Sequence, residues 1–223
     1  MNIKNENSMS MFFSKVYLWM FIGLVVSGLT AYYTSITPSL LKFVYNSFMF
    51  IILSELIIVI AFTALRKKVS PEAARILFII YSAISGLTLS SIFIVYKLSS
   101  IGIVFLSSAI MFGLLAMYGY FTKTNLSSFG KIMIFGLLSV IIMSIINIFI
   151  NGSMFGIILS VISVVLFLGL TAYDMQNLKN IYDYYSDDEK ELSKASIYGA
   201  LDLYLDFINI FLQLLNLFGK GKD

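Results

Sequence analysis

The fold is decided by residues 197–218, which read IYGALDLYLDFINIFLQLLNLF. Polar side chains interrupt this otherwise apolar and aromatic stretch at alternating spacings of four and three residues: Asp202, Asp206, Asn209, Gln213 and Asn216. At about 100° per residue, these positions fall on one stripe of an α-helix. A polar stripe on a helix immersed in lipid has to face protein or water. We therefore expect the other helices of the chain to surround this one.

The composition indicates that the rest of the chain also lies in a membrane. Of 223 residues, 59% are hydrophobic and only 12% are charged, against roughly 25% charged residues in soluble domains. A soluble protein of this length needs more charged surface to cover its core. The chain has no Cys and no His, which excludes disulfides, thiolate sites and imidazole metal sites. Any proton switch must therefore use carboxylates.

Apolar runs long enough to cross the hydrocarbon core, about 20 residues each, predict seven spans. Five lie at residues 17–35, 43–65, 76–96, 98–122 and 197–218, and two more share the charge-free run 132–173. We place a tight hairpin at Asn151-Gly152-Ser153 and a polar loop at 174–196. The prediction is an all-α membrane protein with seven transmembrane helices and the last helix central. It has a short polar tail at 1–15, a single domain at 16–219 and a C-terminal tail at 220–223.

Positive charge is distributed unevenly between the two sides of the predicted bundle. Eleven of the 15 Lys and Arg residues fall on the side that holds the N-terminus, and the other four are Lys42, Lys97, Lys220 and Lys222. Cytoplasmic loops are enriched in Lys and Arg, so we predict a cytoplasmic N-terminus and an outer C-terminus. A re-entrant last segment would instead return the C-terminus to the cytoplasm, and both alternatives stay open.

Acidic side chains at or near membrane depth are the candidate functional residues: Glu55, Asp174, Asp202 and Asp206. Each costs about 2.5–3.5 kcal/mol on insertion scales and needs a partner, a proton or a wet cavity. Arg66, at the inner end of the second span, is a candidate counter-charge, although a topology anchor also explains it. For the Asn and Gln residues of the stripe, hydrogen bonds between helices are an equal alternative.

Four segments, taken in order and spacing, resemble the bacterial type of the Bax inhibitor-1 family. They are 85–93 (SGLTLSSIF), 118–123 (YGYFTK) with Leu126-Ser127, 170–176 (LTAYDMQ), and 199–201 (GAL) with 203–209 (LYLDFIN). The resemblance covers nearly all of the chain from the second span onward. It implies a seven-helix fold with the last helix at the centre, in agreement with the polar stripe.

The resemblance also implies a site and an activity. In this family an aspartate that ends the sixth span and an aspartate inside the seventh share a proton and gate a pH-sensitive calcium leak. The matching positions are Asp174 and Asp206, which would also bind calcium weakly, with Asp202 and Glu55 as additional acidic ligands. No tightly bound cofactor is expected, because calcium is the transported or weakly bound species.

Two positions depart from the family pattern. The family usually has a small polar residue where this chain has Asp202, and a basic residue where it has Asn216. The first departure adds a negative charge one helical turn from Asp206, which could raise a pKa or add a cation ligand. The second removes a cation from the outer end of the stripe, so that an outer electrostatic lock cannot be assumed.

Two other functions compete with a leak. Intramembrane aspartyl proteases also use two aspartates, and Tyr173-Asp174 fits one half of their pattern. The other half requires Gly-x-Gly-Asp, and residues 199–202 (GALD) lack the second glycine. We therefore predict that the protein is not an enzyme. The second alternative is a regulatory protein that binds a membrane-bound protease through a disordered tail at 1–14.

The predicted surroundings follow from these interpretations. The chain is expected to be a multi-pass protein of the bacterial cytoplasmic (inner) membrane, with the lipid bilayer as its environment. A membrane-bound protease is the alternative partner, no nucleic acid is expected, and a monomer is favoured.

Overall fold

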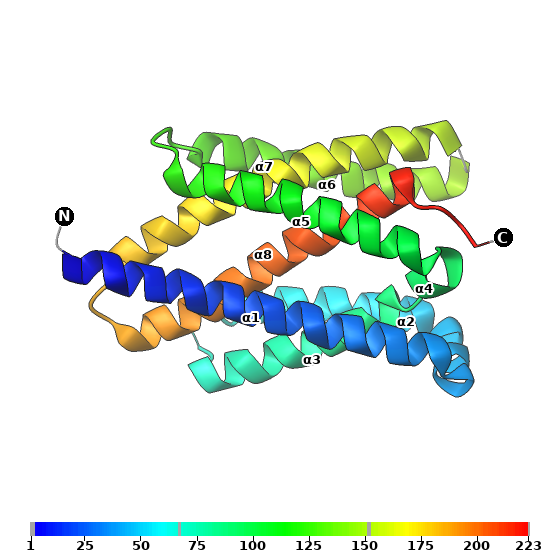
Figure 1. Cartoon of the computed structure of the whole chain (residues 1–223), viewed down its shortest axis with the longest axis horizontal. Coiled ribbons are helices and arrows are strands. Elements are labelled where there is room, and N and C mark those ends of the chain that lie inside the picture. The colour runs from blue at the N-terminus through cyan, green and yellow to red at the C-terminus, as the bar shows by residue number, and fades with distance from the viewer. Residues whose placement is uncertain (1–2, 67, 151–152, 223) are drawn as a thin grey trace. The chain divides into compact units, whose positions relative to one another are not determined.

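A computed structural model describes residues 3–66, 68–150 and 153–222, which form eight helices and no strand (Figure 1). The helices are α1 (Ile3–Ile36), α2 (Pro38–Ala64), α3 (Pro71–Leu89), α4 (Ile92–Val95), α5 (Leu98–Phe121), α6 (Ser127–Ile150), α7 (Ser153–Tyr185) and α8 (Glu189–Phe218). Seven helices are long and apolar enough to cross a membrane, with Pro71–Val95 as one span. This confirms the predicted all-α membrane fold. Residues 151–152 of the predicted hairpin lie outside the described residues.

Prolines set the starts of two helices. Pro38 and Pro71 occupy the first turns of α2 and α3, where a missing N–H costs nothing because that group has no partner within the helix. Ser70 caps α3, since its side-chain oxygen accepts a hydrogen bond of 3.2 Å from the backbone N–H of Ala73. Both helices therefore begin about five residues before the apolar runs that predicted them.

The N-terminal segment differs from the prediction of a polar tail, because α1 already begins at Ile3. Met9, Phe12, Phe13 and Val16 are buried, at the spacings that bring side chains onto one face of a helix. The ring of Phe12 lies 5.6 Å from the ring of Tyr182, between centroids. This apolar face explains why a segment rich in Asn is helical.

The polar segment 174–196 also differs from its prediction, because most of it is helical. Helix α7 continues to Tyr185, and α8 begins at Glu189, so that only residues 186–188 connect the two helices. Met175, Leu178 and Tyr182 are buried and recur at three- and four-residue spacings that place them on one face. Their packing extends α7 beyond the apolar run by which the span was recognised.

The chain divides into two compact units. Unit 1 holds residues up to 96 together with 181–204 and Lys222, and unit 2 holds 97–180 together with 205–221. Both boundaries inside the C-terminal part of the chain fall within helices, α7 and α8, rather than in linkers. Helix α8 thus contributes its first half to unit 1 and its second half to unit 2.

In unit 1, α1 packs along α3 (Figure 1), and aromatic side chains join α8 to α2 and α3. Tyr204 of α8 makes edge contacts with Phe78 and Tyr81 of α3, with ring centroids 5.9 Å and 6.1 Å apart. Tyr198 stacks on Phe62 of α2 with the centroids 4.4 Å apart. The first half of α8 is therefore covered by protein within this unit.

In unit 2, the second half of α8 packs against α5 and α7. The ring of Phe207 lies 5.1 Å from that of Phe105 and 5.7 Å from that of Phe112, both on α5. Of the seven spans, α8 has the largest buried share, 50% of its most apolar window, whereas the span in α6 has 6%. Helix α8 thus contributes buried residues to each of the two units.

Small residues allow close approach of helices at some positions of α3 and α5. Ser82, Gly86 and Ser90 are all buried, as expected for a face that packs on another helix. On α5, Gly119 is buried, but a Cβ at Gly113 would meet nothing within 4 Å. Close packing through a glycine on α5 is therefore found at Gly119 and not at Gly113.

The contact at Gly86 predicts a loss of stability on substitution with alanine. A Cβ there would lie 2.6 Å from the carbonyl oxygen of Ser27 and 2.6 Å from the Cβ of Thr30, both on α1. We expect Gly86→Ala to lower the free energy of unfolding by about 1–3 kcal/mol through overpacking, measured by thermal unfolding in detergent. Gly28→Ala, where a Cβ would meet nothing within 4 Å, is the control and should not destabilise. Equal melting temperatures for the two variants would contradict the tight α1–α3 contact.

Candidate functional site

The four candidate acids divide between the two units. Glu55 on α2 and Asp202 on α8 belong to unit 1, whereas Asp174 on α7 and Asp206 on α8 belong to unit 2. The side chain of Asp206 is buried, with 4% of its surface exposed, and Asp174 is half-buried. Each of these two aspartates takes part in a hydrogen bond or electrostatic interaction. The structure thus brings the predicted pair into the same unit.

Close contacts from α5 and α6 fix the segment of α7 that carries Asp174. A Cβ at Gly119 of α5 would lie 2.1 Å from the carbonyl oxygen of Ala172, so the two backbones approach as closely as only glycine permits. On the other helix, a Cβ at Gly130 of α6 would lie 2.3 Å from the ring of Tyr173. The residues immediately before Asp174 are therefore held on two sides.

Gln176 holds the same segment through its side chain. Its Oε1 accepts a hydrogen bond of 2.8 Å from the backbone N–H of Leu126, and its Nε2 donates one of 2.7 Å to the carbonyl of Thr124. Nearby on α7, the ammonium of Lys179 lies 5.4 Å from the ring centroid of Tyr120, a cation–π geometry. Two of the segments that carry the family resemblance therefore meet in space, which the sequence did not reveal.

The polar residues of the α8 stripe form different kinds of hydrogen bond along the helix. In unit 2, Asn216 donates a hydrogen bond of 2.8 Å from Nδ2 to the hydroxyl of Ser160 on α7. Asn209 instead donates to the carbonyl of Leu205 in its own helix, at 2.8 Å. The interhelical interpretation is thus correct for Asn216, whereas the recorded bond of Asn209 stays within α8.

In unit 1, Asp202 is subject to the charge of the predicted counter-charge. Arg66 follows the end of α2 and interacts electrostatically with Asp202. Its guanidinium lies 5.0 Å from the ring centroid of Tyr198, one turn before Asp202 on α8. The hydroxyl of Tyr198 donates to the carbonyl of Phe62 at 3.1 Å, which fixes the ring that supports Arg66. The positive charge of Arg66 thus acts on Asp202, the residue that departs from the family pattern.

Glu55 also has a partner that the sequence did not single out. The Thr88 hydroxyl on α3 donates a hydrogen bond of 2.5 Å to Oε1 of the half-buried Glu55 on α2. Thr88 belongs to the segment 85–93 that resembles the family. A carboxylate in the middle of a span thus joins two helices of unit 1.

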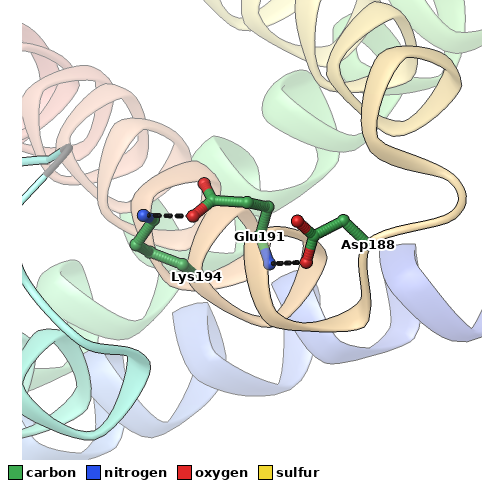
Figure 2. A network of polar contacts seen from close by, with 3 residues as sticks. All are labelled: Asp188, Glu191 and Lys194. Atoms are coloured by element: carbon green, nitrogen blue, oxygen red, sulfur yellow. Dashed lines mark hydrogen bonds and ion pairs between the residues drawn. The ribbon is translucent and has the colours of Figure 1, made fainter.

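The acidic cluster at 187–191, which lies within the predicted polar loop 174–196, forms the connection and the first turn of α8 (Figure 2). Asp188 caps the helix, because its Oδ1 accepts a hydrogen bond of 3.0 Å from the backbone N–H of Glu191. The Glu191 carboxylate pairs with the ammonium of Lys194 at 2.6 Å, and Lys194 is 7% exposed. No sequence signal indicated a buried lysine here.

The described residues offer no ready-made metal cage. Among residues 3–66, 68–150 and 153–222, no three His, Cys, Asp or Glu side chains gather closely enough to hold a metal ion.

Comparison with known proteins places the chain in a family. The model of the family "Inhibitor of apoptosis-promoting Bax1" matches residues 9–223, and the chain therefore belongs to the Bax inhibitor-1 family. It is 40% identical over 215 residues to "Inner membrane protein YbhL" of Escherichia coli K12, covering 95% of this chain and 92% of the relative. It is also 39% identical to an uncharacterized protein of Borreliella burgdorferi, over 99% of this chain and 94% of the relative. The resemblance drawn from the four segments is confirmed.

The two hydrogen bonds of Gln176 predict that its loss loosens the connection between α5 and α6. Each bond contributes about 1 kcal/mol, so Gln176→Ala should increase local opening of residues 122–126 at least roughly tenfold. Trypsin cleavage after the exposed Lys123, followed in detergent, measures this opening. Asn180→Ala, at an exposed position one turn further along α7, is the control. Equal cleavage rates would show that Gln176 does not hold the loop.

Proposed function

We propose that this protein is a pH-sensitive calcium leak channel, without enzymatic activity, gated by proton sharing between Asp174 and Asp206. The observation that supports it most is the burial of Asp206 on a membrane helix, in the same unit as Asp174. Burial of a carboxylate in lipid is costly unless it is protonated or partnered. Membership of the Bax inhibitor-1 family adds support, because the resemblance implies this activity.

The gating mechanism follows from the electrostatics of two neighbouring carboxylates. Two such groups in a low-dielectric site do not both ionise cheaply, so they lose their protons in two coupled steps. With one proton shared, they hold α7 and α8 together and close the path. With both ionised, they repel and expose oxygen atoms, which suit Ca²⁺ as a hard cation. The leak therefore opens as the pH rises.

In this mechanism, the segment of α7 around Asp174 is the part that stays fixed. Contacts at Gly119 and Gly130 and the bonds of Gln176 restrain α7 next to the carboxylate. Repulsion between Asp174 and Asp206 then acts against a segment of α7 that cannot move freely. Transport needs only weak binding of the cation, because a tight site would not release it.

Asp202 and Glu55 are proposed as additional acidic ligands for the cation. Each already interacts with one neighbour, Arg66 for Asp202 and Thr88 for Glu55. Arg66 offsets the negative charge that Asp202 adds one turn before Asp206. In this proposal Arg66 is thus the counter-charge of Asp202, the residue that departs from the family pattern.

The proposed setting is the bacterial inner membrane, the location in the name of the relative YbhL, with a cytoplasmic N-terminus and a monomeric state. A regulator that binds a membrane-bound protease through a disordered tail has less support, since residues 3–14 belong to α1.

The proposal predicts that Asp206→Asn abolishes the pH dependence of calcium flux. In wild-type proteoliposomes loaded with a calcium-sensitive dye, the leak should fall roughly tenfold per pH unit below its midpoint, as the doubly ionised fraction falls. An amide at 206 cannot ionise but still forms hydrogen bonds, so the flux should stay low and flat. Asp183→Asn, at an exposed position near the end of α7, should keep the wild-type profile.

An unchanged profile in Asp206→Asn would refute the gating role. Absence of flux from purified wild-type protein at any pH, with a stoichiometric protease recovered from native membranes, would favour the regulatory alternative.

A further inference from the structure

A second feature of unit 2 lies outside the candidate site, at the start of α5 and the end of α8. A cavity of about 430 Å³ there has a polar end, formed by Ser99, Ser100 and Lys220. Apolar side chains from the same two regions form its walls, among them Ile103, Met111 and Phe218. Its volume is within the usual range for pockets that bind small molecules, about 300–1,000 Å³. The lining is therefore amphipathic.

The backbone holds the polar end in place. The N–H of Lys220 donates a hydrogen bond of 2.9 Å to the hydroxyl of Ser100, and the carbonyl of Lys220 accepts one of 2.9 Å from the N–H of Lys97. The side chain of Lys220 is exposed. Lys220 thus lines the cavity from a fixed backbone position.

The charge of the cavity selects for an anion. The sequence contains no Asp or Glu from residue 73 to residue 173, so α5 brings no carboxylate to the lining. Lys220 is the single charged residue of the lining in the described part of the chain. Hydroxyl groups and an ammonium together suit a phosphate oxygen.

The walls indicate where the occupant comes from. Ile103 and Phe218, which border the cavity, are 68% and 69% exposed. In a membrane-spanning protein, such apolar side chains face acyl chains rather than water. The cavity therefore opens to lipid along its apolar side.

We propose that this cavity binds a phospholipid with an anionic headgroup. The phosphate lies at the polar end against Lys220 and the hydroxyl of Ser99, and one acyl chain follows the face of α5 from Ile103 to Met111. A free phosphate would leave these apolar walls unused. The site is separate from the aspartates and does not depend on the proposed leak.

Native mass spectrometry of the full chain in detergent, with measured amounts of phosphatidylglycerol or phosphatidylcholine, tests this proposal. Wild type should bind one phosphatidylglycerol in preference to phosphatidylcholine. Lys220→Gln should weaken phosphatidylglycerol binding roughly tenfold, since a charge-assisted contact is lost. Ser107→Leu, which fills the cavity without changing its charge, should weaken binding of either lipid.

Lys42→Gln, at an exposed lysine of unit 1, is the matched control and should bind like wild type. Melting temperatures of all variants show whether they fold. Equal weakening by Lys42→Gln and Lys220→Gln would overturn the proposal, because it would show that phosphatidylglycerol is attracted to exposed lysines in general. Full displacement of the lipid by glycerol 3-phosphate at equal concentration would also overturn it, because the site would then recognise only the phosphate.

Discussion

The structure depends on one constraint, which is that the carboxylate and amide groups of α8 cannot face lipid without a large cost in free energy. In unit 1, the rings of Phe78, Tyr81 and Phe62 cover the first half of this helix. In unit 2, α5 and α7 cover the second half, and Asp206 is 4% exposed. Helix α6, which has no charged residue after Lys131, is by contrast mostly uncovered. Polarity along each helix thus decides which helix belongs inside.

Close approach of helix backbones at glycines defines how particular helices pack against one another. Gly86 lies against the backbone of α1, and Gly119 lies against the backbone of α7 at Ala172. Both glycines belong to segments that carry the family resemblance. The bonds of Gln176 to the α5–α6 connection likewise join residues that are distant in sequence. The contact of Gly119 and the bonds of Gln176 hold the part of α7 that carries Asp174.

The sequence predicted the number of spans and the helix that belongs inside, because both follow from the cost of polar groups in lipid. It failed where helices extend past the charge-free runs, since the absence of charge indicates only which residues are apolar enough to lie in a membrane. Beyond Asp174, packing of Met175, Leu178 and Tyr182 continues α7 to Tyr185, and that packing needs partners that no local pattern shows. The partners of the acids were equally hidden. Arg66 was a candidate because of its charge, whereas Thr88 is one hydroxyl among many and acquires its role only from the α2–α3 contact.

Hydroxyl and carboxyl groups differ in whether their own helix can supply a hydrogen-bond partner. The hydroxyls of Ser82, Ser108 and Thr171 donate to the carbonyl four residues earlier in their own helices, so they pack between helices without needing an external partner. An ionised carboxylate only accepts hydrogen bonds, and the interior of a helix has no N–H to spare. Such a group must obtain a donor from another element or take up a proton. Glu55 and Asp202 each interact with a residue outside their own helices, Thr88 and Arg66. The same requirement at the buried Asp206 ties its charge to the packing of the helices around it, which is the property that a proton-operated gate needs.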